Sequence, residues 1–312
     1  MFRKLAYFSL TIFVLSLFIG CEKQDKPKEI SLEKKELADI KPVAIAGKPL
    51  RIAVGGMITP KEGFAYYKKL LDYIGEKIDR NVEFVDRENY KEINELLKKG
   101  DIDIAFVCSG PYVDGHKEFD MQLLVAPSAY GGTVYYSYII VPQNSPVKSL
   151  KELRGKKFVF TDPLSNTGKL VPTYMLAKMK ETPDSFFSHY DFTYKHDKSI
   201  RAVAEGVVDG AAVDSLIWEY LNRTNPEFTS RTKVIEKSPP YGIPPVVVRP
   251  GLEKELKEKL KQVFMNVHND EKGREILKGM MIDKFIEIDD KAYDSIREMK
   301  SWVAKQDDKK SR

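Results

Sequence analysis

Short apolar segments alternate with amphipathic segments from Leu50 onward, and this alternation limits the folds open to the chain. Strand-length apolar runs and helix-type repeats follow one another at 50–56, 64–78, 81–86, 90–100 and 102–109. Strands that alternate with helices form an open sheet of mainly parallel strands flanked by helices. The sequence therefore predicts an α/β fold whose ligands bind beyond the carboxyl ends of the strands.

A second series of helices and strands begins near Pro146. An extended segment rich in Tyr, Val and Ile, 131–146, joins the two series, and the chain returns through 239–250 before its last helices. Two crossings between two α/β units predict two lobes joined by a two-strand hinge. We expect the lobes to comprise 49–140 with 246–312, and 141–245.

The amino terminus carries an export signal. Arg3 and Lys4 precede an apolar run that ends at Gly20-Cys21, a little short for the roughly 20 residues of a membrane-spanning helix. We predict a signal peptide over 1–21, and its resemblance to a bacterial lipobox implies a mature protein lipidated at Cys21. Residues 22–48 are charged and lack aromatics, which predicts a flexible tether.

Composition excludes several functions. The 51 basic and 46 acidic residues give a net charge of +5 without the clustered basic and aromatic pattern of a nucleic-acid interface. Cys108 has no partner for an internal disulfide once Cys21 is lipidated, and no zinc-ligand spacing occurs. His196 has no obvious activated Ser or Cys partner. We expect a protein without catalytic activity, metal or cofactor.

The segment Thr161–Pro172, reading TDPLSNTGKLVP, is the strongest candidate for a binding site. It follows the apolar run Phe158–Phe160 and precedes a helix-compatible stretch, so Ser165, Asn166 and Thr167 stand at a helix start. Free backbone N–H groups, the helix dipole and small polar side chains together suit a compact anion such as phosphate. Ordinary helix capping is the commoner role of these residue types. The segment alone leaves both interpretations open.

Five motifs in order carry a resemblance to a known family. They are GDIDIAFVCSGPYV, VYYSYIIVPQNSPVKSLKEL, TDPLSNTGKLVP, HDKSIRAVAEGVVDGAAVD and KSPPYGIPPVVVRP. This ordered set, over roughly residues 50 to 300, resembles the substrate-binding proteins of phosphate, phosphite and phosphonate ABC transporters. The resemblance implies the two-lobed type II periplasmic-binding fold.

The resemblance also implies a set of ligand contacts. They fall on Ser165, Asn166, Thr167, the Gly168 amide, His196, Tyr135 and Tyr90. Alternation along a strand lets only one of Tyr135 and Tyr136 face the cleft easily. For Tyr90, plain packing is an equally good interpretation, and His196 is a capping or surface residue in the alternative interpretation.

Two further features bear on selectivity. Relatives that bind aminoalkylphosphonates place an acidic residue where this chain has Ile243, Pro244 and Pro245, so a ligand ammonium would lack its partner. Asp214 repels an anion unless the anion carries a proton to share. We hypothesise that Asp214 selects protonated phosphorus oxyanions over sulfate; a surface aspartate is the alternative.

These observations predict a monomeric, lipid-anchored, extracytoplasmic solute-binding protein of an ABC importer. Phosphite, methylphosphonate and phosphate are the expected ligands, and a membrane permease is the expected partner, recognised in the closed form. An anion sensor that signals to a membrane partner stays open, as does a larger phosphonate or phosphate ester as ligand.

Overall fold

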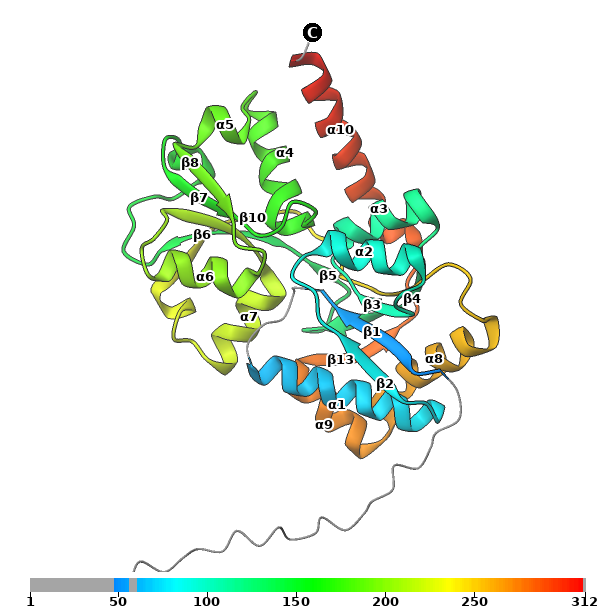
Figure 1. Ribbon diagram of the computed structural model, residues 1–312. Coiled ribbons are helices and arrows are strands. Elements are labelled where there is room, and N and C mark those ends of the chain that lie inside the picture. The colour runs from blue at the N-terminus through cyan, green and yellow to red at the C-terminus, as the bar shows by residue number, and fades with distance from the viewer. Residues whose placement is uncertain (1–47, 56–60, 311–312) are drawn as a thin grey trace, which may run out of the picture. The chain divides into compact units, whose positions relative to one another are not determined.

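The computed structural model describes residues 48–55 and 61–310, with side chains at 48–55 and 64–306. The predicted signal peptide, Cys21 and all but the last residue of the predicted tether lie outside the described residues. Within the described part, no helix has both the length and the apolar character needed to cross a bilayer. The described chain forms two main sheets and a two-stranded ribbon (Figure 1).

Six strands form the first sheet in the order β13-β4-β12-β3-β1-β2. Their bounds are Leu50–Val54 (β1), Val82–Val85 (β2), Ile104–Phe106 (β3), Gln122–Ala129 (β4), Val246–Val248 (β12) and Ile282–Ile286 (β13). β1 runs parallel to β2 and β3, whereas β12 is antiparallel to β3 and β4. Val246 pairs with Phe106, so the returning chain enters beside the end of β3. The α/β prediction is confirmed, with sheets more mixed than predicted.

Side chains of the first sheet alternate between two helical layers. Ile52 and Phe106 face a core with the first layer, which consists of α1 (Lys61–Ile78), α8 (Lys254–Asn266) and α9 (Glu271–Met280). Ala53 and Ala105 face the second layer, which consists of α2 (Tyr90–Lys99), α3 (Ser109–Phe119) and α10 (Asp294–Lys310). Because both faces are buried, the central strands β3 and β12 are apolar throughout rather than alternating.

Five strands form the second sheet in the order β10-β6-β9-β7-β8. Their bounds are Ser137–Pro142 (β6), Lys157–Phe160 (β7), His189–Phe192 (β8), Gly210–Asp214 (β9) and Thr232–Lys237 (β10). Helices cover both faces of this sheet: α4 (Val171–Lys178) and α5 (Pro183–Phe186) share one core, and α6 (His196–Ala204) and α7 (Ser215–Thr224) share the other. We refer to the parts built on the two sheets as the first and second lobes.

A short ribbon links the two lobes where the sequence predicted a hinge. β5 (Val134–Tyr135) pairs antiparallel with β11 (Tyr241–Gly242), and Tyr135 lies opposite Tyr241. The second sheet begins at Ser137, a few residues before the predicted lobe boundary at 140/141. Residues 134–141 form one run of β-type residues, so the sequence holds no signal for where the ribbon ends and the sheet begins.

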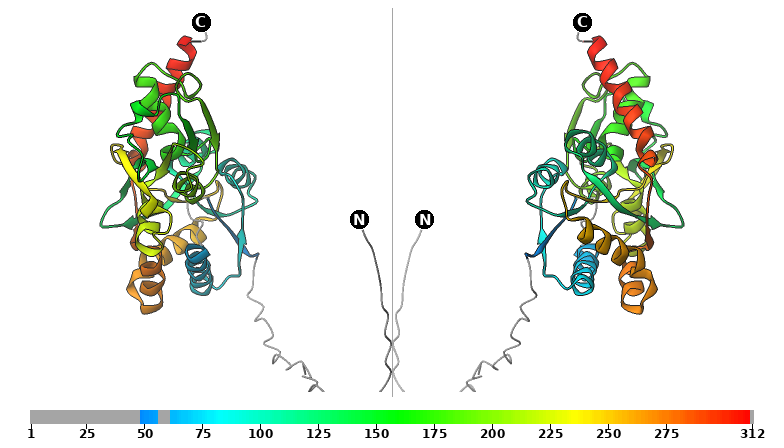
Figure 2. Two further views of the ribbon diagram at one scale, coloured as in Figure 1. Left: turned by 90° about the vertical axis from the view of Figure 1, so that its left-hand side faces the viewer. Right: turned by 90° about the vertical axis from the view of Figure 1, so that its right-hand side faces the viewer.

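The last helix contacts both lobes. α10 follows strands of the first lobe, yet it contacts α4 of the second lobe as well as α3 of the first (Figures 1 and 2). The rings of Trp302 in α10 and Tyr174 in α4 meet edge to face with centroids 5.0 Å apart. The contact between the lobes therefore extends beyond the ribbon.

Candidate functional site

The segment after β7 turns sharply into a helix, as the sequence predicted. Ser165 ends the turn, Asn166–Leu170 forms one π-helical turn, and α4 continues from Val171. A Cβ atom at Gly168 would lie 2.5 Å from the Thr161 side chain, so only glycine fits between this turn and the end of β7. The hydroxyl of Ser137 donates a hydrogen bond of 2.6 Å to the carbonyl of Thr167, which fixes the turn against β6.

One predicted ligand contact is occupied by the protein itself. The backbone N–H of Gly168 donates to Oγ of Ser165 at 2.9 Å, as in an ordinary helix cap. The Gly168 amide is therefore not free to meet a ligand, contrary to its predicted role. Ser165 keeps its hydroxyl proton, because the oxygen that accepts this bond can still donate one of its own.

His196 stands at the start of α6, beside the end of β9. Its Nδ1 accepts a hydrogen bond of 3.0 Å from the backbone N–H of Asp214 and lies 3.1 Å from Oγ1 of Thr161. Burial lowers the pKa of the imidazole to about 3, so the ring is neutral. Because Nδ1 accepts, the ring proton is carried by Nε2.

Asp214 ends β9 and begins α7. Its Oδ1 caps the helix by accepting a bond of 2.7 Å from the backbone N–H of Leu216. Burial raises the pKa of the carboxyl to about 7, against the opposing effect of hydrogen bonds from the backbone of Leu216 and Ile217. Asp214 is fully buried rather than a surface residue, the alternative that the sequence left open. The carboxyl can therefore gain or lose a proton near neutral pH.

Two tyrosines reach this region from other elements. Tyr90, the first residue of α2, has a buried ring that also contacts the Gly55 position. Tyr135 lies in the ribbon, where its hydroxyl accepts a bond of 3.1 Å from Nδ2 of Asn166 and lies 3.6 Å from Sγ of Cys108.

Burial raises the pKa of the Tyr90 and Tyr135 hydroxyls well above the usual value, and Asp214 contributes to both shifts. Tyr136 is only partly buried, so Tyr135 is the inward-facing member of the pair.

Five of the predicted residues hold half of the ten buried side-chain atoms that have no hydrogen-bond partner in the described part of the chain. Each is at most 1 % exposed and has a side-chain atom without a hydrogen-bond partner among the described residues. The atoms are the Tyr90 hydroxyl, Asn166 Oδ1, Thr167 Oγ1, His196 Nε2 and Asp214 Oδ2. A buried polar atom without a partner costs about 1–3 kcal/mol, so a cluster of them needs an explanation such as a ligand.

A bond between the lobes was not predicted. The backbone N–H of Tyr90 in the first lobe donates to Oδ2 of Asp162 in the second at 3.2 Å, while Oδ1 of Asp162 accepts from the backbone N–H of Leu164 at 2.7 Å. Burial raises the pKa of the Asp162 carboxyl, and these two hydrogen bonds oppose the shift. No local sequence signal marks Asp162, because its partner lies in a different lobe.

Lys169 is the second feature that sequence reasoning missed. Its ammonium lies over the ring of Phe160 at 4.0 Å and near the rings of Tyr190 and Phe192, at 5.5 and 5.7 Å. We refer to these three rings around the Lys169 ammonium as the aromatic cage. Aromatic residues alternate along β7 and β8, and that spacing is the sequence signal that could have predicted the cage. In the described residues the unpartnered cluster contains no Lys or Arg, and no group of three or more potential metal ligands occurs.

Comparison with known proteins places the chain in a family. Residues 53–293 match the family of ABC transporter, phosphonate, periplasmic substrate-binding proteins. The chain belongs to this family. It is 24% identical to a probable ABC transporter phosphite binding protein, PhnD1, of Prochlorococcus marinus (strain MIT 9301), over 72% of this chain and 80% of the relative.

Two solved structures share the fold. One is a binding protein component of an ABC phosphonate transporter from Pseudomonas aeruginosa, with a TM-score of 0.78 and 24% identity over 84% of this chain and 88% of that one. The other is PhnD1 from Prochlorococcus marinus in complex with methylphosphonate, with a TM-score of 0.74 and 21% identity over 83% and 99%. The predicted two-lobed periplasmic-binding fold is confirmed, and membership of a periplasmic family implies that the protein acts outside the cytoplasm.

Proposed function

We propose that the chain binds a small, singly protonated phosphorus oxyanion, such as phosphite, methylphosphonate or phosphate, for an ABC importer. The observation that carries this proposal is the cluster of five buried, unpartnered polar atoms, contributed by α2 of the first lobe and by three segments of the second. Such a cluster is costly in a protein without ligand and becomes favourable when an anion accepts hydrogen bonds from its donors.

The donors suit an oxyanion. His196 offers Nε2–H, and the hydroxyls of Thr167, Tyr90 and Ser165 each have a proton to donate. The Asn166 amide contributes a donor when it is turned over, since Oδ1 then accepts from the Tyr135 hydroxyl and Nδ2 faces the ligand; the two ends of an amide have nearly the same shape. Uncharged donors of this kind bind an anion without requiring a cation.

Asp214 provides selectivity among anions in this proposal. A carboxyl with a pKa raised to about 7 shares one proton with a phosphorus oxyanion, either as acceptor from a monoanion or as donor to a dianion. Sulfate has no proton to share near neutral pH, so it binds only to protein that holds the proton on Asp214, and the protonated fraction falls as pH rises above about 7. We therefore expect sulfate to bind more weakly than phosphite.

Lobe closure links binding to transport. The Tyr90–Asp162 hydrogen bond and the contacts of α10 join the lobes, and the proposed ligand donors come from both lobes. We infer that a ligand stabilises the closed arrangement and that the permease recognises this form. The fully buried state of the donor residues supports a site that is inaccessible until the lobes separate.

A thermal-shift panel tests the ligand class. Purified protein lacking residues 1–21 is heated with phosphite, phosphate, methylphosphonate, 2-aminoethylphosphonate or sulfate, since a ligand of the folded state raises the melting temperature. We expect shifts with the first three compounds and smaller or no shifts with the last two. Absence of a shift with every phosphorus compound, or equal affinity for sulfate and phosphite, contradicts the proposal.

Anchoring through Cys21 is a separate proposal, based on the lipobox-like ending of the signal segment. Full-length protein and a Cys21→Ser variant are expressed in a bacterial host, and the membrane and soluble fractions are compared after labelling with a fatty-acid analogue. We expect label and membrane retention only with cysteine at position 21. An unlabelled wild-type protein contradicts the proposal.

A further inference from the structure

Two backbone segments from different lobes meet at Gly110. This residue is the second of α3 in the first lobe, and it is buried. A Cβ atom at this position would lie 2.4 Å from the carbonyl oxygen of Leu164 and 3.1 Å from the backbone nitrogen of Asn166, both in the second lobe. A carbon atom does not approach a backbone oxygen that closely, so only glycine fits here while the lobes are together.

The backbone conformation of Gly110 does not itself require glycine. Gly110 is not among the described glycines that have a positive φ angle. Pro111 follows it, and a residue with a side chain is disfavoured in a helical conformation before proline. That restriction acts within one lobe, so a substitution of Pro111 separates it from the contact between the lobes.

The start of α3 is held in place on its own side of the contact. The hydroxyl of Ser109 donates a hydrogen bond of 2.7 Å to the carbonyl of Gly242 in the ribbon. Nδ2 of Asn94, in α2, donates to the carbonyl of Pro111 at 2.9 Å. Both neighbours of Gly110 are therefore fixed, and α3 cannot retreat from an added side chain without losing these bonds.

The facing segment of the second lobe is held equally firmly. Asp162 accepts two bonds from it, from the backbone N–H of Leu164 to Oδ1 at 2.7 Å and from the backbone N–H of Ser165 to the carbonyl at 2.9 Å. The next turn is bonded to β6 through Thr167 and Ser137. A side chain at position 110 would therefore displace the whole lobe rather than a loop.

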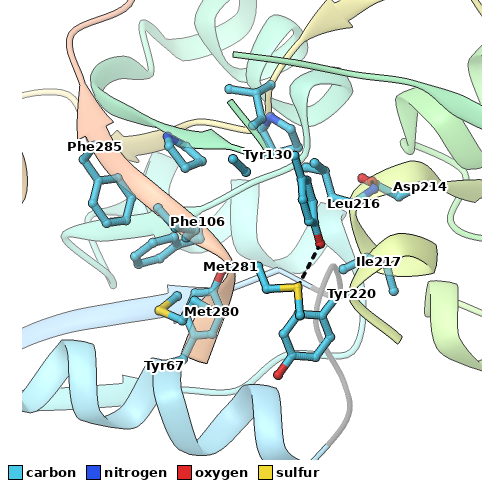
Figure 3. Close-up of a pocket in the computed structure, with 15 residues that line it drawn as sticks. Tyr67, Phe106, Tyr130, Asp214, Leu216, Ile217, Tyr220, Met280, Met281 and Phe285 are labelled. Atoms are coloured by element: carbon cyan, nitrogen blue, oxygen red, sulfur yellow. Dashed lines mark hydrogen bonds between the residues drawn. The ribbon is translucent and has the colours of Figure 1, made fainter. Parts of the chain in front are cut away.

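Elsewhere the lobes meet through side chains. Tyr220 of α7 and Tyr67 of α1 line a pocket of about 70 Å³ between the lobes (Figure 3). The hydroxyl of Tyr220 donates to the carbonyl of Gly279 at 3.4 Å, and the guanidinium of Arg223 lies 4.5 Å from the centre of the Tyr130 ring. Side chains adjust their rotamers, whereas the backbones at Gly110 cannot. The approach of the lobes is therefore limited at Gly110.

We propose that Gly110 is a positioning residue of the anion site, because its lack of a side chain lets the turn that carries Asn166 reach the first lobe. This inference rests on the proposed function, in which Tyr90 of the first lobe and His196 of the second contact one anion. A side chain at position 110 holds these donors apart, although each lobe folds as before. Gly110 thus acts through the closed arrangement and does not contact the ligand.

The variant Gly110→Ala tests the proposal by separating ligand affinity from stability. Calorimetry at pH 7 compares phosphite, phosphate and methylphosphonate, and affinity for the tightest of them should fall roughly 10- to 100-fold, the effect of overpacking a rigid contact. The melting temperature of the ligand-free protein should stay within about 3 °C of wild type, because the clash disappears when the lobes separate. At saturating ligand, X-ray scattering should give a larger radius of gyration for the variant than for wild type.

Two controls locate the effect. Gly132→Ala makes the same change where no atom lies within 4 Å of the added Cβ, and it should bind as wild type does. Pro111→Ala should also bind as wild type. The double variant Gly110→Ala/Pro111→Ala should keep the full loss of affinity, because it lifts the restriction before proline and leaves the clash between the lobes.

The outcomes separate the two proposals. Wild-type affinity in Gly110→Ala, or restored affinity in the double variant, overturns the positioning role. A double variant that does not fold, or that loses stability and affinity together, also overturns it, because the contact then belongs to the folded core. Wild-type protein that binds none of the three compounds overturns the proposed function instead, and the inference falls with it.

Discussion

The backbone N–H of Asp214 donates a hydrogen bond of 3.0 Å to Nδ1 of His196. An amide N–H has no acceptor role, so this contact fixes the tautomer of the ring and places its proton on Nε2. Burial holds the pKa of the imidazole at about 3, so the ring stays neutral down to acidic pH. In the proposed anion site, His196 is thus an uncharged donor rather than a cation.

Removing this donor should weaken ligand binding. His196→Ala is expected to lower affinity for the best phosphorus oxyanion by roughly 10- to 100-fold, the effect of a charge-assisted hydrogen bond of about 1.5 to 3 kcal/mol. Titration calorimetry at pH 7 measures it. His189→Ala, at an exposed position of β8, is the matched control and should bind as the wild type does. Equal affinities for the two variants remove His196 from the site.

The same two residues should shape acid stability in opposite senses. Because the pKa of His196 is depressed in the folded protein, the unfolded chain binds an extra proton between about pH 3 and 6.5. The contribution of His196 to the free energy of unfolding is therefore complete above pH 6.5 and is lost as pH falls. The pKa of Asp214 is about 3.8 in the unfolded chain and about 7 in the folded protein, so the folded protein binds an extra proton between these pH values. The contribution of Asp214 to the free energy of unfolding is therefore complete below pH 3.8 and is lost as pH rises to about 7. Between about pH 4 and 6.5 the two effects oppose each other.

Denaturant titrations of the ligand-free protein between pH 4 and 7 test this balance. Relative to wild type, Asp214→Asn should gain about 1.4 kcal/mol of unfolding free energy per pH unit as pH rises toward 7, because the variant lacks the loss of stability that deprotonation of Asp214 causes in the wild type. His196→Gln should change with the opposite sign below pH 6.5, which makes each variant the control for the other. Parallel curves for the wild type and both variants show that neither group is titrated differently in the folded protein.

The sequence predicted the parts of this fold that are encoded locally. The alternation of strands and helices from Leu50, the turn at Ser165 and the crossing at Tyr135 each follow from neighbouring residues. The contact of Asp162 with the backbone of Tyr90 could not be predicted, because it joins residues 72 positions apart in different lobes. At Ser165 the residue types left helix capping and anion binding both open, and the structure shows that Ser165 caps the turn through the Gly168 amide.

The aromatic cage of Lys169 should stabilise the turn that carries the proposed anion-binding residues. Lys169→Met keeps the length of the side chain and removes its charge, and we expect a loss of about 1 to 2 kcal/mol in unfolding free energy together with a several-fold loss of ligand affinity. Lys169→Arg, which retains a cation over the rings, should lie close to wild type. The free energy is measured by denaturant unfolding and the affinity by calorimetry. A methionine variant as stable as wild type contradicts a stabilising role for the cage.

The hydrogen bond between Asp162 and Tyr90 should contribute to closure rather than to folding. Asp162→Asn keeps an oxygen for the Leu164 amide but presents an NH₂ group, which cannot accept, to the Tyr90 amide. Since this bond forms only when the lobes are together, we expect ligand affinity to fall about tenfold or more while the melting temperature of the ligand-free protein changes little.

A control within the first lobe should behave in the reverse way. Asp103 pairs with Arg249 at 2.9 Å and accepts from the backbone N–H of Arg51 at 3.0 Å, and all three residues lie in one lobe. Asp103→Asn is therefore expected to lower the melting temperature and to leave ligand affinity within about twofold, because it weakens folding without affecting closure. If Asp162→Asn instead destabilises the ligand-free protein and leaves affinity unchanged, the contact belongs to the folded core and the proposed closure does not depend on it.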